Sequence, residues 1–279
     1  MKYCYKYKGE LKNINTEIKA YFLGFMYGDG TLAKKENTFR DIRISIDVED
    51  SYILDRMREE LIFFCPPKSH DYSKYNSKNK IQKCLRLSSG PVMRDLMAHG
   101  LVPRKSCANN KDKLKYPIIP SDLEHHFIRG FFDADGSICV MKKRPNLRYV
   151  EIGSVCETFL KELNGRLNDF NFFYKEKDNG KKAKQLMHVL YLMKTSDIIK
   201  FKKYLYKNAT IFIIRKKALF DSLRVVNKVL ERKIECPFCA SYHVIFNCIR
   251  GPSKRLICKN CRKNFSIRLN NIISPPILV

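Results

Sequence analysis

One nine-residue pattern occurs twice, and it constrains the fold more than any other feature of the sequence. Residues 22–30 read FLGFMYGDG, and residues 128–136, 106 positions later, read IRGFFDADG. Both copies have a small residue at the third and seventh positions, Asp at the eighth and Gly at the ninth. A single apolar helix ending in Asp-Gly is usually only a helix followed by a turn. Two matched copies, separated by the length of a small domain, indicate a duplicated unit in which the pattern has a shared role.

The small residues of each copy fall on one face of a helix. Gly24 and Gly28 are four positions apart, as are Gly130 and Ala134, and residues four apart lie one above the other on a helix. Gly in a helix interior costs roughly 0.5–1 kcal/mol relative to Ala, so its repeated use favours a packing requirement. We therefore predict that the two motif helices pack closely against each other.

Such packing would bring Asp29 and Asp135 together at the same end of the helix pair. Two adjacent carboxylates repel each other unless a divalent cation lies between them. Mg²⁺ prefers oxygen ligands and keeps several of its waters, and divalent ions of this kind can drive phosphodiester hydrolysis. The paired aspartates therefore predict a metal-dependent centre.

The two copies resemble the signature motifs of the LAGLIDADG homing endonucleases. The second copy matches closely, whereas the first has Tyr27 where the family often has Asp. The resemblance covers roughly residues 16–228. It implies an α+β fold in which an αββαββα unit is duplicated with pseudo-two-fold symmetry and forms antiparallel DNA-binding saddles. Two motifs in one chain imply a monomer.

Hydrophobic periodicity shows the same order of elements in both halves. In the first half we expect helix 17–28, strands 31–35 and 40–48, helix 50–64, strands 70–75 and 81–87, and helix 91–98. In the second half we expect helix 123–134 capped by Ser121, strands 137–141 and 147–154, helix 157–168, strands 172–177 and 186–194, helix 196–206 and a last helix to 229. The predicted domains are an N-terminal arm (1–15), a first half (16–108), a linker (109–120), a second half (121–229) and a C-terminal module (230–279).

Composition points to a polyanionic partner. Lys and Arg number 54 against 28 acidic residues, which gives a formal charge of +26, and such an excess favours nucleic acid. The hydrophobic fraction of 44% is too high for a disordered chain. The sequence has no apolar run of a signal peptide or a membrane span. We therefore expect an intracellular protein in a reducing compartment, such as a prokaryotic cytoplasm or an organelle matrix, with no membrane partner and no secretion.

The resemblance implies roles for particular residues of the motifs. It places the catalytic, Mg²⁺-binding acids at Asp29 and Asp135, with the preceding carbonyls of Gly28 and Ala134 as further metal ligands. The family also uses a basic residue near the scissile phosphate, which can position the attacking water or stabilise transition-state charge. The pairs Arg104-Lys105 and Arg215-Lys216 follow the second hairpin of each half. We assign that catalytic role to Lys105 and Lys216, and we expect Asp133 to be structural.

The predicted hairpins are the expected DNA-reading surface. A two-stranded ribbon fits the major groove, where base edges are distinguishable. The candidates share a basic side chain on a hairpin strand or loop; they are Arg40, Arg43, Arg86, Lys142, Lys143 and Arg148.

The C-terminal module contains two CxxC pairs with 18 residues between them. Cys236, Cys239, Cys258 and Cys261 have the spacing of a closed, structural, tetrahedral Zn²⁺ site. The segment resembles the zinc ribbons appended to many nucleic-acid enzymes. Further DNA contacts are expected from its basic side chains, among them Arg255, Lys259, Arg262 and Lys263.

The leading hypothesis is a site-specific homing endonuclease that cuts double-stranded DNA at a long asymmetric target. Mg²⁺ or Mn²⁺ would be its cofactor, with Ca²⁺ as a non-cleaving substitute and one structural Zn²⁺. Two alternatives are an RNA maturase that acts on its own intron RNA, and a DNA-binding regulator of the same fold that has lost cleavage. The presence of both acids argues against the regulator. The features of an intein are absent, so we expect a free-standing or intron-encoded protein.

Overall fold

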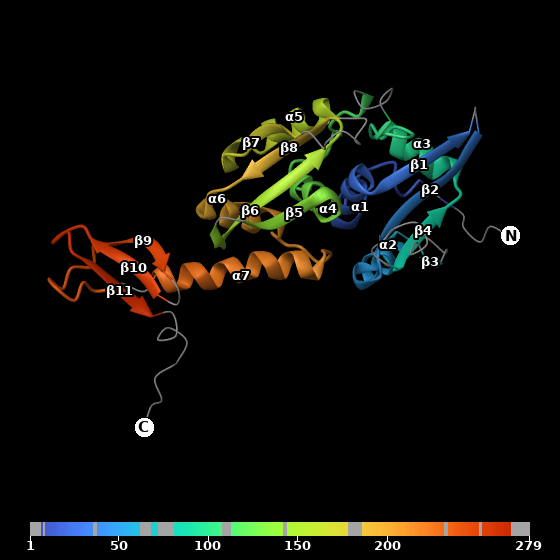
Figure 1. The fold of residues 1–279 in the computed structure, drawn as a ribbon. Helices are drawn as coiled ribbons and strands as arrows, with labels where there is room; N and C mark the ends of the chain where they lie inside the picture. Colours follow the sequence, from blue (N-terminus) through green and yellow to red (C-terminus); the bar gives the residue numbers. More distant parts are fainter. Residues whose placement is uncertain are drawn as a thin grey trace. The chain divides into compact units, whose positions relative to one another are not determined.

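Figure 1 shows the computed structural model of the chain. The structure describes residues 7, 9–35, 38–61, 68–71, 81–107, 113–141, 144–177, 186–231, 234–250 and 253–268. The chain divides into two compact units, Met1–Phe220 and Asp221–Val279. Among the described helices, none combines the length and apolar character needed to cross a membrane.

The first unit contains the same series of elements twice. The first copy consists of α1 (Glu17–Gly28), β1 (Gly30–Lys35), β2 (Thr38–Asp47), α2 (Tyr52–Glu60), β3 (Lys68–Asp71), β4 (Ile81–Leu87) and α3 (Gly90–Ala98). The second consists of α4 (Glu124–Asp135), β5 (Gly136–Met141), β6 (Arg144–Ser154), α5 (Glu157–Arg166), β7 (Phe173–Lys177), β8 (Met187–Leu192) and α6 (Thr195–Leu205). Short 3₁₀ turns follow β2 (Val48–Asp50) and α5 (Asn168–Phe170), and α7 (Ile214–Glu231) comes after α6. This order confirms the predicted αββαββα duplication and the α+β fold.

The two sheets have matching topology and register. Their strand orders are β1-β2-β4-β3 and β5-β6-β8-β7, and the neighbouring strands are antiparallel. Gly30 pairs with Ile44 in the first sheet, and Gly136 pairs with Ile152 in the second. Positions of one sheet therefore have definite counterparts in the other, except beyond the irregularities at Ala33/Lys34 and Val140/Met141, where the registers differ.

Alternation along β2 separates the two faces of the first sheet. Ile42, Ile44 and Ile46 are buried, whereas Arg43 between them is exposed. Period-two alternation of this kind is what a strand with one covered face requires. The predicted alternation is thus confirmed from Ile42 to Ile46. For Val48 it is wrong, because this residue begins the 3₁₀ turn after β2 and is 41% exposed.

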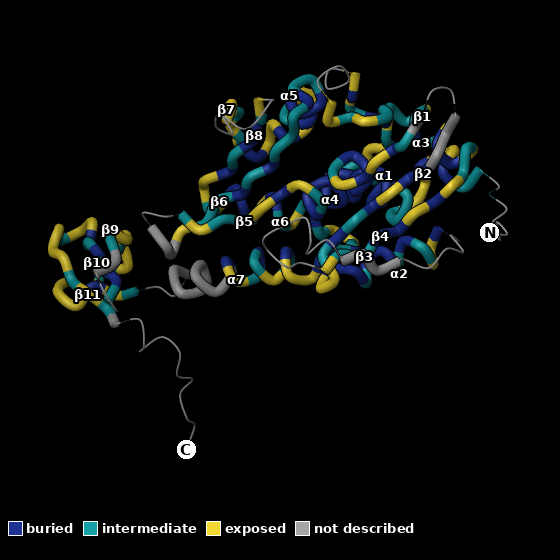
Figure 2. The backbone as a smooth tube through the Cα atoms, turned by 45° about the vertical axis from the view of Figure 1, so that its right-hand side comes forward, coloured by how far each residue is buried: buried dark blue, intermediate teal, exposed yellow. Residues whose placement is uncertain are grey.

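Helices α1 and α4 lie side by side at the centre of the first unit (Figures 1 and 2). A Cβ added at Gly24 would overlap the backbone oxygen of Phe127, and one at Gly130 would overlap the backbone oxygen of Tyr21. The backbones approach so closely that only glycine fits at these two positions. The predicted packing of the motif helices through their small faces is therefore confirmed.

The segment between α6 and α7 ties the second copy back to the first. Glu17 at the start of α1 accepts hydrogen bonds from the backbone of Thr210 (2.7 Å) and from the Arg129 guanidinium (2.6 Å). Arg129 is fully buried. The Tyr52 hydroxyl of α2 accepts from the Ile214 backbone N–H (2.6 Å). These bonds join elements of both halves into one structure.

Some predicted boundaries are wrong or lie outside the described residues. Ser121 does not cap α4: the helix begins at Glu124, and Leu123 occupies the cap position without a side-chain hydrogen bond. The cause is a turn closed by the Leu123 N–H and the Pro120 carbonyl, which moves Ser121 outside the helix. The expected end of the second helix at 62–64 and the strand residues 72–75 fall outside the described residues.

The second unit holds a three-stranded antiparallel sheet. Its strands are β9 (Val244–Arg250), β10 (Ser253–Cys258) and β11 (Asn264–Arg268), in the order β11-β10-β9. Leu256 of the central strand is buried, whereas Ile245 and Phe246 of β9 remain exposed. So small a sheet buries little apolar surface, which is the usual situation of a domain that needs a metal for stability.

Candidate functional site

The two motif aspartates occupy equivalent places at the ends of the paired helices. Asp29 is the C-cap residue of α1, and Asp135 is the last residue of α4. A Cβ added at Gly28 would overlap that of Ala134 and come within 3.2 Å of Asp135 Oδ2. The small seventh positions therefore let the two acids approach each other across the helix pair.

The electrostatics of these acids show that they interact. Burial and the negative charge of Asp29 raise the pKa of Asp135 to about 7, although Lys105 and Lys216 lower it in part. Burial also raises the pKa of Asp29, against the opposing charges of Lys216 and Lys105. Both aspartate side chains keep a solvent-accessible side. The four residues that sequence analysis singled out thus form one charge cluster.

The donor set of this cluster fits a hard divalent cation. Two neighbouring carboxylates whose pKa values are both raised are stabilised when a cation replaces the proton, and Mg²⁺ prefers oxygen ligands. The carbonyls of Gly28 and Ala134 directly precede the two acids in sequence. They supply oxygen atoms of the same hard type.

The two lysines repeat one contact in the two halves. Lys105 Nζ donates to the carbonyl of Gly30, and Lys216 Nζ donates to that of Gly136 at 2.7 Å. Gly30 and Gly136 are the ninth residues of the two motifs. The lysines are therefore related by the duplication and sit directly beside the acids.

Lys216 has a second role that the sequence does not reveal. Its ammonium also donates to the carbonyls of Phe132 (2.9 Å), Asp133 (2.6 Å) and Ala134 (3.4 Å), so it satisfies the C-terminal carbonyls of α4. Burial lowers its pKa to about 8. Burial also lowers the pKa of Lys105, which the charges of Asp135 and Asp29 partly restore.

The sixth motif positions are structural. Asp133 is buried and accepts hydrogen bonds from the Tyr21 hydroxyl (2.8 Å) and the Ile213 backbone (2.8 Å). Tyr27, at the matching place in the first copy, donates to the carbonyls of His99 (2.8 Å) and Lys115 (3.0 Å). The departure of Tyr27 from the family pattern therefore supports packing between α1 and the segment after α3.

The predicted DNA-contacting residues of the hairpins are only partly described. Arg43 on β2 and Arg86 on β4 have side chains that are 46% and 57% exposed, and Arg148 on β6 is half-buried. Lys142 and Lys143 lie outside the described residues, as does the side chain of Arg40.

Sequence analysis missed the partners of these arginines. Asp41 binds both Arg43 and Arg86 and is fully buried beneath them. The spacing of Asp41 and Arg43, two positions apart in an alternating strand, is a signal that could have found this pair.

The second sheet carries an aromatic cluster instead. The Tyr191 ring centroid lies 6.0 Å from that of Tyr149 and 5.4 Å from that of Phe173.

The four predicted zinc cysteines converge in the second unit. Their sulfurs all lie within 4.8 Å of one another. The Cys236–Cys261 and Cys239–Cys258 sulfur pairs are each 3.6 Å apart. Sulfurs around a tetrahedral zinc with bonds of about 2.3 Å would lie roughly 3.8 Å apart. The four cysteines therefore fit one Zn²⁺, and their separation excludes disulfide bonds.

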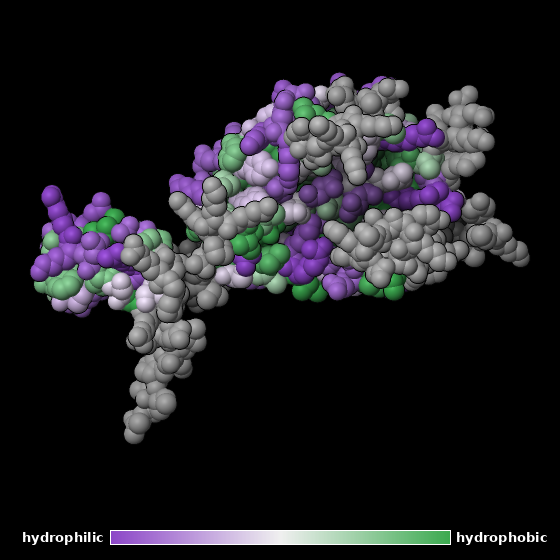
Figure 3. Space-filling model, viewed as in Figure 1, coloured by the Kyte–Doolittle hydropathy of each residue, from purple (hydrophilic) through white to green (hydrophobic). Residues whose placement is uncertain are grey.

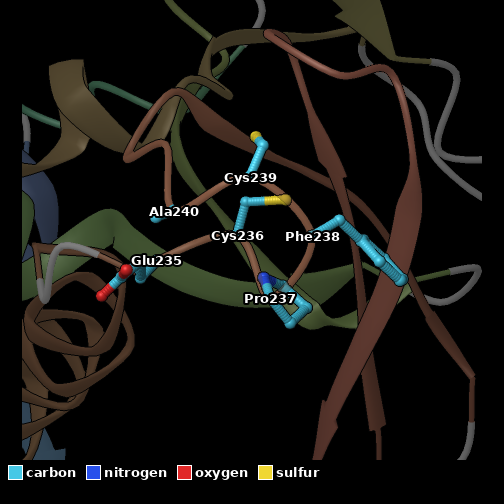
Figure 4. A pocket seen from close by; sticks show the side chains of 6 residues that line it. All are labelled: Glu235, Cys236, Pro237, Phe238, Cys239 and Ala240. Atoms are coloured by element: carbon cyan, nitrogen blue, oxygen red, sulfur yellow. The ribbon is translucent and has the colours of Figure 1, made fainter.

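The two halves of this cysteine cluster have the same local geometry. Ala240 and Arg262, each directly after the second cysteine of its pair, have φ angles of 55° and 58°. Figure 4 shows Cys236 and Cys239 on the turn before β9, with the Phe238 ring pointing away from the two sulfurs. Backbone N–H groups of Cys261 and Asn260 lower the pKa of Cys258 to about 6. The backbone of Lys263 acts in the same direction on Cys261, but burial and hydrogen bonds with the neighbouring thiols raise the pKa of Cys261 to about 11. Cys258 is therefore the thiol that ionises first. Thiolates are the form that binds zinc.

The basic residues of this unit remain accessible. Lys259, Arg262 and Lys263 are exposed, and Arg255 is half-buried. The Lys263 ammonium lies 4.9 Å from the centre of the Phe238 ring. Hydrophilic residues also predominate on the face of this unit seen in Figure 3.

A second group of metal-ligand types lies outside the acid cluster. Glu157 of α5, Glu176 of β7 and His188 of β8 place ligand atoms within 4.8 Å of one another. Lys161 already pairs with Glu157 at 2.6 Å, and the Tyr174 hydroxyl contacts both Glu157 and His188. Glu157 and His188 therefore already have protein partners, and we assign no ion to this group.

Known proteins share both the sequence of the second half and the fold. A LAGLIDADG-like domain model matches residues 122–206. The chain is 27% identical over 169 residues to "Probable intron-encoded endonuclease 4" of Neurospora crassa, a match that covers 53% of this chain. The match spans 31% of that relative's own length.

Two solved structures can be compared with this chain. The LAGLIDADG homing endonuclease I-GzeII in complex with its DNA target gives a TM-score of 0.51 at 13% identity, covering 77% of this chain and 91% of that one. The meganuclease I-SmaMI bound to uncleaveable DNA gives a TM-score of 0.49 at 12% identity, also over 77% and 91%. The likeness to I-GzeII shows that this chain has the LAGLIDADG homing endonuclease fold.

Proposed function

We propose that this LAGLIDADG protein is a site-specific endonuclease that hydrolyses both strands of a double-stranded DNA target. The observation that carries the proposal is the convergence of Asp29 and Asp135 with Lys105 and Lys216 at the junction of the two halves. Each duplicated half contributes one aspartate and one lysine to this cluster. Such a two-fold arrangement suits a reaction that is carried out once on each strand of a DNA duplex. The proteins described above include "Probable intron-encoded endonuclease 4" and a homing endonuclease in complex with its DNA target, which supports the proposal.

The acid pair would hold Mg²⁺ or Mn²⁺, with Gly28 and Ala134 contributing carbonyl oxygens and Ca²⁺ as a non-cleaving substitute. When bound, the cation would stabilise charge that develops on the phosphate and lower the pKa of its waters. Lys105 and Lys216 would add positive charge beside the scissile phosphates.

The two sheets would bind DNA as paired saddles on one monomer. The formal charge of +26 provides the electrostatic attraction to phosphates. Arg43 and Arg86 lie on the face of the first sheet opposite its buried isoleucines, and we assign the reading of base edges to this face. Arg148 is two residues before buried Val150 and therefore lies on the covered face of the second sheet, so we assign it no base-reading role. Since the two sheets differ in sequence, the target would be long and asymmetric.

The second unit would extend this footprint as a zinc ribbon. One structural Zn²⁺ on the four cysteines would stabilise the small sheet, and its exposed Lys and Arg side chains would contact phosphates or bases. In domain terms, residues 16–108 and 121–229 would form the endonuclease halves and 230–279 the accessory DNA-binding module. Reduced zinc thiolates also favour a reducing, intracellular compartment.

Cleavage of a randomised duplex library by the purified protein in Mg²⁺ tests the proposal. We expect recovery of one long consensus, cut in both strands at fixed positions. The Asp169→Asn variant, which changes an exposed carboxylate in the 3₁₀ turn after α5, should recover the same consensus. Recovery of uncut duplexes only, or of cuts without any consensus, would contradict the proposed function.

A further inference from the structure

Asp41 is enclosed by two arginines on the first sheet. Both oxygens of its carboxylate accept from Arg43, with Nε–Oδ1 and Nη2–Oδ2 distances of 3.0 Å each. Arg86 Nε also contacts Oδ2. The Asp41 side chain is 0% exposed, whereas those of Arg43 and Arg86 are 46% and 57% exposed. The carboxylate is therefore covered by the guanidinium groups, which themselves reach solvent.

The register explains why such a carboxylate is needed. Arg43 on β2 is directly opposite Arg86 on β4. Like charges directly opposite each other on a sheet are destabilising. Asp41 lies on the same face, two residues from Arg43, and compensates both charges. It also fixes the planes of the two guanidinium groups through charge-assisted bonds.

The equivalent positions of the second sheet carry different chemistry. Because Ile44 corresponds to Ile152 through the matching register, Arg43 corresponds to Glu151, and Arg86 corresponds to the residue opposite Glu151, which is Tyr191. Asp41 corresponds to Tyr149.

In that second sheet Tyr149 and Tyr191 pack together with ring centroids 6.0 Å apart, and Glu151 pairs with Lys177 at 3.3 Å. The second sheet therefore presents aromatic rings and a neutralised ion pair where the first presents two organised cations.

We infer that Asp41 is a positioning residue that holds Arg43 and Arg86 as a guanine-reading pair. The inference rests on the proposed function and specifies its target: the half-site under the first sheet contains guanine at the positions these arginines meet. A guanidinium group has five N–H donors, and Asp41 takes two from Arg43. Arginine recognises the O6 and N7 acceptors of guanine in pairs in the major groove, and the side chains of Arg43 and Arg86 are sufficiently exposed to meet a base edge.

Pre-organisation is what Asp41 adds to this recognition. A guanidinium held in one plane loses less side-chain freedom when it binds a base edge. Its N–H groups also point in a fixed direction. The side chain therefore cannot rotate to form hydrogen bonds with a base whose acceptors are placed differently. Arginines that only contacted phosphates would need no such orientation, and they would not distinguish bases.

The test measures base preference at each position of the target by sequencing the duplexes that the full-length protein binds in Ca²⁺. For the wild-type protein we expect a guanine preference of roughly tenfold or more at one or two positions within one half-site. Asp41→Asn should reduce that preference several-fold and leave the other half-site unchanged. Arg43→Lys and Arg86→Lys keep the positive charge but lose the paired N–H donors of the guanidinium group. Each should also reduce the guanine preference.

The control is Asp169→Asn, which should keep the guanine preference. Arg43→Lys and Arg86→Lys keep the test decisive if Asp41→Asn does not fold. Unchanged guanine preference in these two lysine variants would overturn the inference and indicate phosphate contacts. A folded Asp41→Asn variant with full preference would overturn the role of Asp41. Absence of any sequence preference in the wild-type protein would overturn the proposed function itself.

Discussion

Asp29 and Asp135 are close enough for the charge of one to act on the other, and together with burial this raises the pKa of Asp135 to about 7. A cation that binds the Asp135 carboxylate must displace the proton that this carboxylate holds below pH 7. We therefore predict that Ca²⁺ binding to the DNA complex strengthens as pH rises from 6 to 8, with most of the gain between pH 6 and 7 and a plateau above. Calorimetric titration at several pH values measures this. Affinity independent of pH would show that Asp135 is already ionised.

The same shift predicts how the metal-free fold responds to pH. The folded state binds the Asp135 proton more tightly than the unfolded state, where the pKa is near 3.8. This group therefore favours folding most at low pH, and its contribution is lost as pH rises from about 4 through 7. In chelator, the stability of wild type relative to Asp135→Asn should fall over that interval. Urea unfolding at each pH provides the comparison, and a constant difference would argue against the shift.

Close packing of α1 and α4 predicts opposite effects for two kinds of glycine substitution. Gly24→Ala and Gly130→Ala would each push a methyl group into a backbone oxygen, and we expect a loss of about 3 kcal/mol or more. Gly165→Ala on α5 is the control, because nothing lies within 4 Å of the added Cβ. It should stabilise the protein by roughly 0.5–1 kcal/mol. Equal effects at the three sites would contradict the close helix approach.

Lys216 should contribute to stability as well as to catalysis. Lys216→Met would remove the donor shared by the carbonyls at the end of α4, at a cost of roughly 2 kcal/mol or more. Lys200→Met, at an exposed position on α6, should change stability little. Because the pKa of Lys216 is lowered from 10.5 to about 8, wild-type stability relative to Lys216→Met should rise between pH 8 and 10.5. Thermal unfolding of the variants across that range is the measurement.

The cysteine cluster predicts one zinc per chain. Cys236→Ser or Cys258→Ser should abolish zinc retention, whereas Cys248→Ser, whose thiol lies outside the cluster, should keep it.

Truncation after Lys233 should weaken DNA binding and shorten the footprint on one side without moving the cuts, because linked modules add affinity through effective concentration. Elemental analysis and footprinting provide the readouts. A shifted cut site would contradict an accessory role for this unit.

Local periodic signals predicted most of the fold. The small residues of the two motifs predicted that α1 and α4 pack together, because residues spaced four apart form one small face on each helix. The alternation of Ile42, Ile44 and Ile46 predicted β2, and the two CxxC pairs predicted the converging sulfurs. In each case the residues that form the sequence pattern are the same residues that make the predicted contact.

Contacts between distant segments that no repeated motif marks could not be predicted in this way. Lys216 is buried against α4 because the segment after α6 folds back onto the helix, which no local pattern records. The pairing of Asp41 with Arg86 depends on the register of β2 and β4. Ser121 fails as a cap because the preceding proline starts a turn there instead. In each case the deciding partner comes from tertiary structure or from competing turn chemistry.

The most direct test of the central claim is strand-resolved cleavage by Asp29→Asn and Asp135→Asn on the mapped target in Mg²⁺. Because both acids hold the catalytic centre, neither variant should make a double-strand break, while DNA affinity stays within about tenfold of wild type, a difference of roughly 1.4 kcal/mol. Asp169→Asn should cleave both strands normally. Full double-strand cleavage by either motif variant would contradict the assignment of the two acids.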